Sequence, residues 1–154
     1  MLSYLLEYLW PNNNVETCDL PIIENPTEFY FLSLLKEDDN SWSIHGLWPQ
    51  DTLKHYPSFC KNVEFDETKL EPIMDRLKKE WFSNRGADDI FWKHEYLKHG
   101  TCNFNNFNEF EYFKTTLDLF DKAISLNLPE QFYDSNSGKC MIPVDRNLDF
   151  FKIN

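Results

Sequence analysis

The sequence has little glycine, little positive charge and no long apolar run. Only 4 of its 154 residues are Gly, which excludes a collagen-like repeat. No apolar stretch approaches the roughly 18 residues that a membrane-spanning helix needs. Apolar residues make up 42% of the chain and charged residues 27%. These proportions are typical of a globular chain and exclude intrinsic disorder and a coiled coil.

Positive charge is scarce, because 15 Lys and Arg face 26 Asp and Glu, which gives a net charge of -11. This balance argues against a large basic face that docks on the backbone of DNA or RNA. We therefore expect any nucleic-acid substrate to be bound locally. We also expect the negative field to raise the pKa of the histidines, so that an activity dependent on them favours mildly acidic pH.

The ends and the cysteines leave the compartment open. The first eleven residues have no basic region and no small-residue cleavage site, and Glu7 interrupts their apolar run, so we expect a strand and not a signal peptide. The chain has no Cys-x-x-Cys pair. Its cysteines are even in number and widely spaced, which allows two disulfides or reduced thiols. They are Cys18, Cys60, Cys102 and Cys140.

Length and periodicity predict one α+β domain over residues 1–154. The predicted strands are 2–9, 41–47 and one or two within 139–153, around a turn at 145–147. The predicted helices are 66–82, 88–99 and 108–126. Residues 29–35 fit either a strand or a helix, and 10–26 and 129–138 are predicted loops. We expect Pro49 to end the second strand and Gly100 to close the second helix in a left-handed conformation.

Three of the four histidines fall in two short segments, one at the end of the 41–47 strand and one in the 88–99 helix. On a helix, His94, Glu95, Lys98 and His99 lie within an arc of about 140°, so two imidazoles, a carboxylate and an ammonium share one face. The simpler interpretation is a solvated helix with ion pairs four residues apart. A second histidine segment, around His45, favours a site.

Other kinds of site fit the sequence less well, and a structural role for Cys102 is favoured over a nucleophilic one. The zinc motif His-Glu-x-x-His needs a histidine at position 98, which is Lys. Cys102 follows His99, but no third group that would orient a Cys–His pair is identifiable. The chain has no Gly-x-Ser-x-Gly elbow. What remains is acid-base chemistry by two histidines, assisted by a positive charge. The attack of a ribose 2′-hydroxyl on the neighbouring phosphate requires this combination.

The two histidine segments resemble the paired active-site motifs of the ribonuclease T2 family of metal-independent, base-tolerant endoribonucleases. They are Ile44-His-Gly-Leu-Trp-Pro49 and Phe91-Trp-Lys-His-Glu-Tyr-Leu-Lys-His-Gly-Thr-Cys102. Shorter matches are Trp10-Pro11 with Cys18, Tyr56-Pro57-x-x-Cys60 and Tyr112-Phe113. The resemblance covers residues 4–126.

The resemblance implies a role for each matched residue. His99 would be the general base that takes the 2′-hydroxyl proton, and His45 the general acid that protonates the leaving 5′-oxygen. Glu95 and Lys98 would stabilise the phosphorane, and His94 would contact the phosphate.

Base binding would use aromatic residues. Trp48 and Phe91 match positions that line the two base subsites, and Tyr56 lies near a third aromatic. Gln50 stands where an acidic or small polar residue is commoner, which leaves the base preference open.

The resemblance also implies the T2 fold, with a central, mostly antiparallel sheet and packed helices, and a Cys60–Cys102 disulfide that leaves Cys18 and Cys140 as a second pair. The C-terminal part is shortened. The implied substrate is single-stranded RNA, and neither DNA nor a membrane is an expected partner. No metal or cofactor is implied. The family resemblance implies a monomer of secreted or endolysosomal type, although no signal peptide is expected in this chain. The competing hypotheses are a degenerate member that binds RNA or protein without cleavage and a structural interaction protein.

Overall fold

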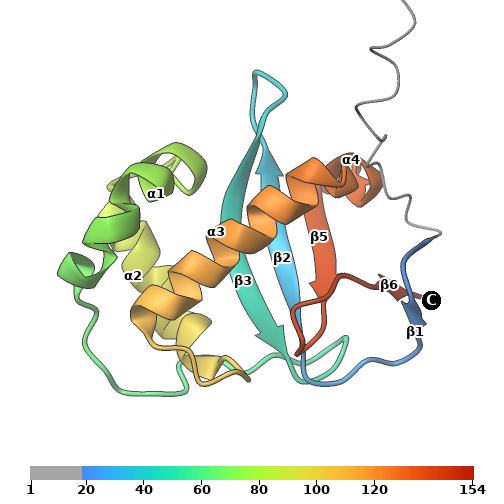
Figure 1. Ribbon diagram of the computed structural model, residues 1–154, viewed down its shortest axis with the longest axis horizontal. Coiled ribbons are helices and arrows are strands. Elements are labelled where there is room, and N and C mark those ends of the chain that lie inside the picture. Colours follow the sequence, from blue (N-terminus) through green and yellow to red (C-terminus); the bar gives the residue numbers. More distant parts are fainter. Residues whose placement is uncertain (1–18) are drawn as a thin grey trace, which may run out of the picture.

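The computed structural model describes residues 19–154, and a four-stranded antiparallel sheet lies at its centre (Figure 1). The strand order is β3-β2-β5-β4, so β3 is an edge strand among the described residues. The strands are β2 (Phe29–Lys36), β3 (Trp42–Gln50), β4 (Tyr133–Asp134) and β5 (Lys139–Val144). The short strands β1 (Ile22–Ile23) and β6 (Lys152–Ile153) form a separate parallel pair.

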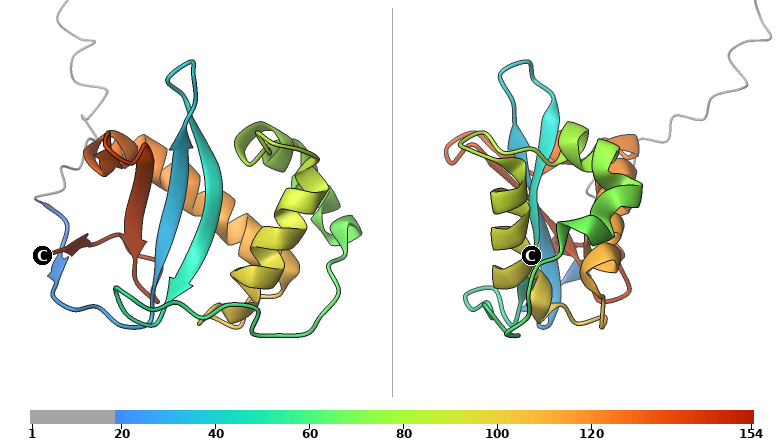
Figure 2. Two further views of the ribbon diagram at one scale, coloured as in Figure 1. Left: turned by 180° about the vertical axis from the view of Figure 1, so that it is seen from behind. Right: turned by 90° about the vertical axis from the view of Figure 1, so that its left-hand side faces the viewer.

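The long helix α3 runs diagonally across the sheet, and α1 and α2 lie beyond the β3 edge (Figures 1 and 2). The α-helices are α1 (Met74–Glu80), α2 (Asp88–Lys98), α3 (Glu109–Ser125) and α4 (Leu128–Gln131). Two 3-10 helices, η2 (Glu67–Ile73) and η3 (Gly100–Cys102), precede α1 and follow α2. The α+β class with a mostly antiparallel sheet is therefore confirmed.

The strands differ from the sequence predictions in two places. The ambiguous segment around residues 29–35 is a strand. The prediction that Pro49 ends the next strand is wrong, because β3 continues to Gln50 and Pro49 pairs with Tyr30. An edge strand tolerates proline, because the missing N–H can fall on the side without a neighbour. The strand predicted for residues 2–9 lies outside the described residues, as does Cys18.

The helix predicted for 66–82 is present in two parts. The side chain of Asp66 accepts a hydrogen bond from the backbone N–H of Thr68 at the start of η2. Pro72 lies in η2, and regular α-helix begins only at Met74. Proline lacks an N–H and crowds the preceding turn of an α-helix, which accounts for the division.

The expected conformation of Gly100 is wrong. α2 ends at Lys98, and Gly100 begins η3 without a positive φ. Glycine is required here for a different reason, because a Cβ atom at this position would lie 2.6 Å from Tyr96 and 3.0 Å from Tyr112. The absence of a side chain at Gly100 therefore lets the end of α2 and the start of α3 approach closely.

The C-terminal region contains more regular structure than predicted. The prediction of a loop over residues 129–138 is wrong in part, because α4 extends into this range and β4 forms within it. The two final strands and their turn are confirmed, with the N–H of Asp145 donating to the carbonyl of Asp149 at 2.9 Å. The predicted third helix is also confirmed, and Asn108 and Glu111 form a capping box at its start.

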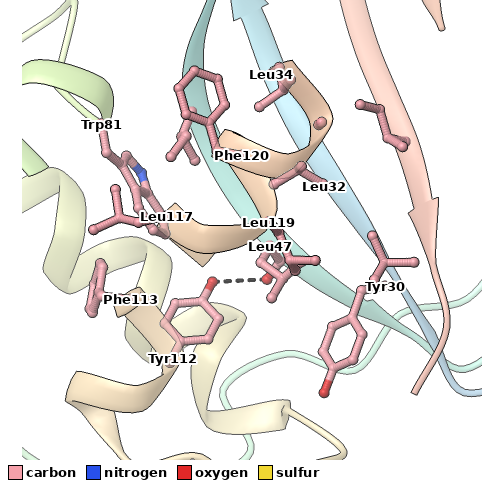
Figure 3. Close-up of a cluster of buried hydrophobic side chains, with 14 of the residues drawn as sticks. Tyr30, Leu32, Leu34, Leu47, Trp81, Tyr112, Phe113, Leu117, Leu119 and Phe120 are labelled. Carbon is pink, nitrogen blue, oxygen red and sulfur yellow. Dashed lines mark hydrogen bonds between the residues drawn. The ribbon is translucent and has the colours of Figure 1, made fainter. Parts of the chain in front are cut away.

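The core lies between α3 and the sheet (Figure 3). Aromatic side chains on its helical side also donate hydrogen bonds to the backbone of β3. Trp81 Nε1 donates to the carbonyl of His45 at 3.0 Å, and the Tyr112 hydroxyl donates to the carbonyl of Leu47 at 2.8 Å. Trp92 Nε1 in turn donates to the carbonyl of Trp81 at 2.6 Å. These bonds fix the middle of β3, which carries His45.

Across residues 19–154, none of the helices combines the length and the apolar character that a membrane crossing requires.

Replacement Tyr112→Phe should destabilise the fold while keeping the ring. It removes the donor to the Leu47 carbonyl from a site with no access to water, which typically costs about 1–3 kcal/mol. Urea denaturation measures the change in the free energy of unfolding. Tyr133→Phe, at a partly exposed ring on β4, is the control and should lie within about 0.5 kcal/mol of the wild type. Equal urea midpoints for the two variants would contradict the prediction.

Candidate active site

The two histidine segments meet at a pocket of about 290 Å³. β3 contributes His45 and Trp48 from one side, and the C-terminal half of α2 contributes its charged residues from the other. The residues that line the pocket are His45, Trp48, Gln50, Tyr56, His94, Glu95, Lys98 and His99. Seven of the eight site residues predicted from the sequence are therefore brought together.

The eighth, Phe91, lies in a second pocket of about 420 Å³. Its ring centroid is 5.8 Å from that of His45, and His45 lines both pockets. The other lining residues are Leu35, Phe82, Ser83, Asn84 and Arg85. Sequence reasoning missed the 82–85 segment, because a loop between two helices carries no periodic signal. Gln50 was noted only as a departure from the family pattern, because the strand that carries it into the pocket was predicted to end at Pro49.

Glu95 is the most deeply buried charged group of the site. The residue is 2% exposed, and its Oε1 lies 3.6 Å from Nε2 of His45. Burial raises the pKa of Glu95 from 4.5 to about 7, although the hydrogen bond from Trp48 and the charge of Lys98 oppose the shift. Near neutral pH this carboxyl can therefore hold or release a proton beside His45.

The surroundings of His45 and His99 both favour the neutral form of the imidazole. Burial, followed by the charges of Lys98, His94 and His45, lowers the pKa of His99 to about 3. The pKa of His45 is also lowered, first by burial and then by Lys139, Arg85 and His94. The expectation that the net negative charge raises these pKa values is wrong, because local desolvation outweighs a field that solvent screens.

The imidazole of His99 is held mainly by packing. Within residues 19–154 its buried Nδ1 has no hydrogen-bond partner. The ring instead stacks on Trp48, with centroids 5.1 Å apart and planes 25° from parallel. A neutral imidazole beside a pocket can accept a proton from a bound hydroxyl.

Tyr56 and His94 lie at the rim of the pocket. Tyr56 is 50% exposed, its ring centroid is 6.1 Å from that of His99, and the Lys98 ammonium lies 5.8 Å from it. His94 is exposed, with the exposed ring of Phe59 beside it at 6.5 Å between centroids. The rim therefore offers aromatic faces next to positive charge, the combination that stacks bases and attracts phosphate.

The Cys60–Cys102 disulfide ties the loop carrying Tyr56 to the end of α2. Two hydrogen bonds reinforce it: the N–H of Phe59 donates to the carbonyl of Lys98 at 2.9 Å, and the N–H of Cys60 donates to the Thr101 hydroxyl at 3.1 Å. Cys140 is buried on β5 and forms no disulfide with another cysteine among residues 19–154. Because Cys18 lies outside the described residues, the second pairing stays a prediction.

In the described part of the chain, no three His, Cys, Asp or Glu side chains gather as a metal site would require.

Comparison with known proteins identifies the family. A model of the Ribonuclease T2 family matches residues 2–136. The chain belongs to the ribonuclease T2 family. Ribonuclease DdI of Dictyostelium discoideum is 35% identical over 113 residues, which cover 71% of this chain and 50% of that protein. Ribonuclease 1 of Arabidopsis thaliana is 38% identical over 86 residues, 53% of this chain and 37% of that protein. The chain thus spans half or less of these T2 relatives.

Solved T2 structures share the fold. A mutant of RNase MC1 in complex with 5′-GMP superposes with a TM-score of 0.66 and 18% identity, covering 84% of this chain and 94% of that one. RNase NT in complex with 5′-AMP gives a TM-score of 0.61 and 21% identity, with 84% and 91% covered.

Replacement Glu95→Gln should make the protein more stable at alkaline pH. Because the pKa of Glu95 is raised in the folded state, from 4.5 to about 7, its contribution to stability is complete below pH 4.5 and is lost as the pH rises through 7. Glutamine carries no such penalty. At pH 8 the variant should gain about 3 kcal/mol relative to its difference from the wild type at pH 4.

Urea denaturation at both pH values measures this difference. Glu71→Gln, on the exposed side of η2, is the control and should follow the wild type at both pH values. If Glu95→Gln also follows the wild type, Glu95 is not a desolvated carboxyl.

Proposed function

We propose that this chain is an endoribonuclease that cleaves single-stranded RNA by transesterification. The observation that carries the proposal is the placement of His45 and His99 around one pocket, with Glu95 and Lys98 beside them. Membership of the T2 family and the ribonuclease names of the relatives support it.

In the proposed reaction, neutral His99 takes the proton of the ribose 2′-hydroxyl, and the freed oxygen attacks the adjacent phosphorus. The bond from phosphorus to the 5′-oxygen breaks, and protonated His45 gives its proton to that oxygen. Lys98 and Glu95 stabilise the negative charge of the phosphorane, and His94 holds the phosphate. The product is a 2′,3′-cyclic phosphate, which water opens to a 3′-phosphate. No metal takes part, and DNA, without the 2′-hydroxyl, is not a substrate.

We assign the base on the 5′ side of the cleaved bond to the pocket with Trp48 and Tyr56, and the following base to the pocket with Phe91. Stacking on aromatic rings is worth about 1–3 kcal/mol per base and accepts any sequence. The solved relatives bind nucleotides, 5′-GMP in the RNase MC1 mutant and 5′-AMP in RNase NT, which supports nucleotide pockets here. We propose that residues 1–154 act as one domain and as a monomer.

The decisive experiment incubates the protein with mixed-sequence single-stranded RNA at pH 5 in excess EDTA. We expect fragments with cyclic phosphate ends, and loss of at least about 10³-fold in rate for both His45→Ala and His99→Ala, because each removes an acid or base of the reaction. Intact RNA with folded, oxidised protein would instead favour a member of the family that binds without cleavage. Cleavage that EDTA abolishes and a divalent ion restores would refute the metal-free mechanism.

The pH profile of kcat/KM should be a bell on the acid side of neutrality. Its rising limb follows deprotonation of His99, whose pKa is lowered to about 3, and its falling limb follows deprotonation of His45, whose pKa lies below 6.5. The measurement is initial cleavage rate against pH with one dinucleoside monophosphate. A maximum above pH 7, or a flat profile from pH 5 to 8, would contradict these assignments.

A further inference from the structure

One side chain, Trp48, contacts three of the residues proposed to act in the reaction. Its ring stacks on His99, with a centroid distance of 5.1 Å. It also meets His45 edge to face, at 4.9 Å and 72°. Its Nε1 donates a hydrogen bond of 2.9 Å to Oε2 of Glu95. A base platform needs only an open ring face, so these contacts indicate an additional role.

The hydrogen bond to Glu95 matters because that carboxyl has few partners. Among residues 19–154, Trp48 is the one hydrogen-bond donor to the Glu95 side chain, and the other oxygen faces His45 at 3.6 Å. A buried carboxylate with a single donor is free to change rotamer when the donor is lost. The hydrogen bond from the indole N–H therefore fixes the orientation of the Glu95 carboxyl toward His45.

Gly46 leaves room for this hydrogen bond. A Cβ atom at Gly46 would clash with both Oε2 of Glu95 and Nε1 of Trp48, the two atoms that the bond joins. The backbone at Gly46 has no positive φ, so conformational freedom does not account for the glycine. The absence of a side chain at this position and the Trp48–Glu95 contact belong to one arrangement.

We propose that Trp48 is a positioning residue of the cleavage reaction, which holds Glu95 against His45 through its indole N–H in a space left open by Gly46. The proposal rests on the proposed function and deepens it. One face of the indole is covered by His99, so any base that enters the pocket can stack only on the remaining surface. Trp48 therefore acts on the rate of the chemical step through Glu95.

The test compares Trp48→Phe with the wild type on a dinucleoside monophosphate. Phenylalanine keeps an aromatic face and lacks the N–H, so we expect kcat to fall about tenfold with KM changed less than about twofold. In a double-mutant cycle with Glu95→Gln, the double variant should be no slower than Glu95→Gln alone, because Trp48 acts through that carboxyl. A rise in KM with constant kcat would show that Trp48 is only a base platform and would overturn the proposal. A double variant slower than Glu95→Gln by the same factor that Trp48→Phe alone causes would do the same, because the two residues would then act independently.

A second measurement does not depend on cleavage. The pKa of Glu95 is followed by NMR of the protein with ¹³C-labelled glutamate side chains, and it should rise in Trp48→Phe because a donor to the charged form is lost. Gly46→Ala should raise it in the same way. Gly86→Ala is the matched control, since nothing lies within 4 Å of a Cβ there, and it should leave Glu95 unchanged.

The two measurements separate the possible failures. If the wild type cleaves RNA and the pKa of Glu95 does not rise in Trp48→Phe, the positioning role is wrong and the proposed function stands. If the wild type fails to cleave, the proposed function falls and the catalytic sense of the positioning role falls with it, even where the NMR titration shows the hydrogen bond.

Discussion

The attachment of the middle of β3 to the helices is the constraint on which the site depends. Trp81 and Tyr112 donate buried hydrogen bonds to the carbonyls of His45 and Leu47, and so they fix the strand that carries His45. Together with the hydrogen bond from Trp48 to Glu95, this attachment sets the distance between His45 and the charged residues of α2. The Cys60–Cys102 disulfide, which joins η3 just after α2, fixes the loop with Tyr56 in the same way.

Once the two segments are docked, burial sets the chemistry. Glu95 and His99 are both removed from water, and desolvation drives each toward its neutral form, the carboxyl by a raised pKa and the imidazole by a lowered one. A neutral imidazole at His99 can accept a proton. The Glu95 carboxyl titrates near neutrality, so it can exchange a proton beside His45. Lys98 and His94 remain nearer to solvent, where a phosphate can reach them.

The sequence predicted much of this arrangement. The two histidine motifs contain six of the residues that line one pocket, the shorter Tyr56-Pro57 match supplied a seventh, and apolar periodicity located the helices. Features set by tertiary contacts were missed. Pro49 continues a strand because that strand is at an edge, and Gly100 is needed for close packing on Tyr96 and not for a left-handed turn. Phe91 lies in a separate pocket because the 82–85 loop packs beside it. The sign of the histidine pKa shifts depended on burial, which composition does not report.

The buried carboxyl of Glu95 also affects how such a protein changes over generations. A residue that is kept for chemistry at a cost in folding free energy is maintained only while selection acts on the reaction. When that selection is relaxed, a substitution that neutralises position 95 raises stability and is retained. If the proposed function holds, loss of catalysis through a change at position 95 raises stability near neutral pH. Family members that keep the fold without cleaving RNA are therefore expected.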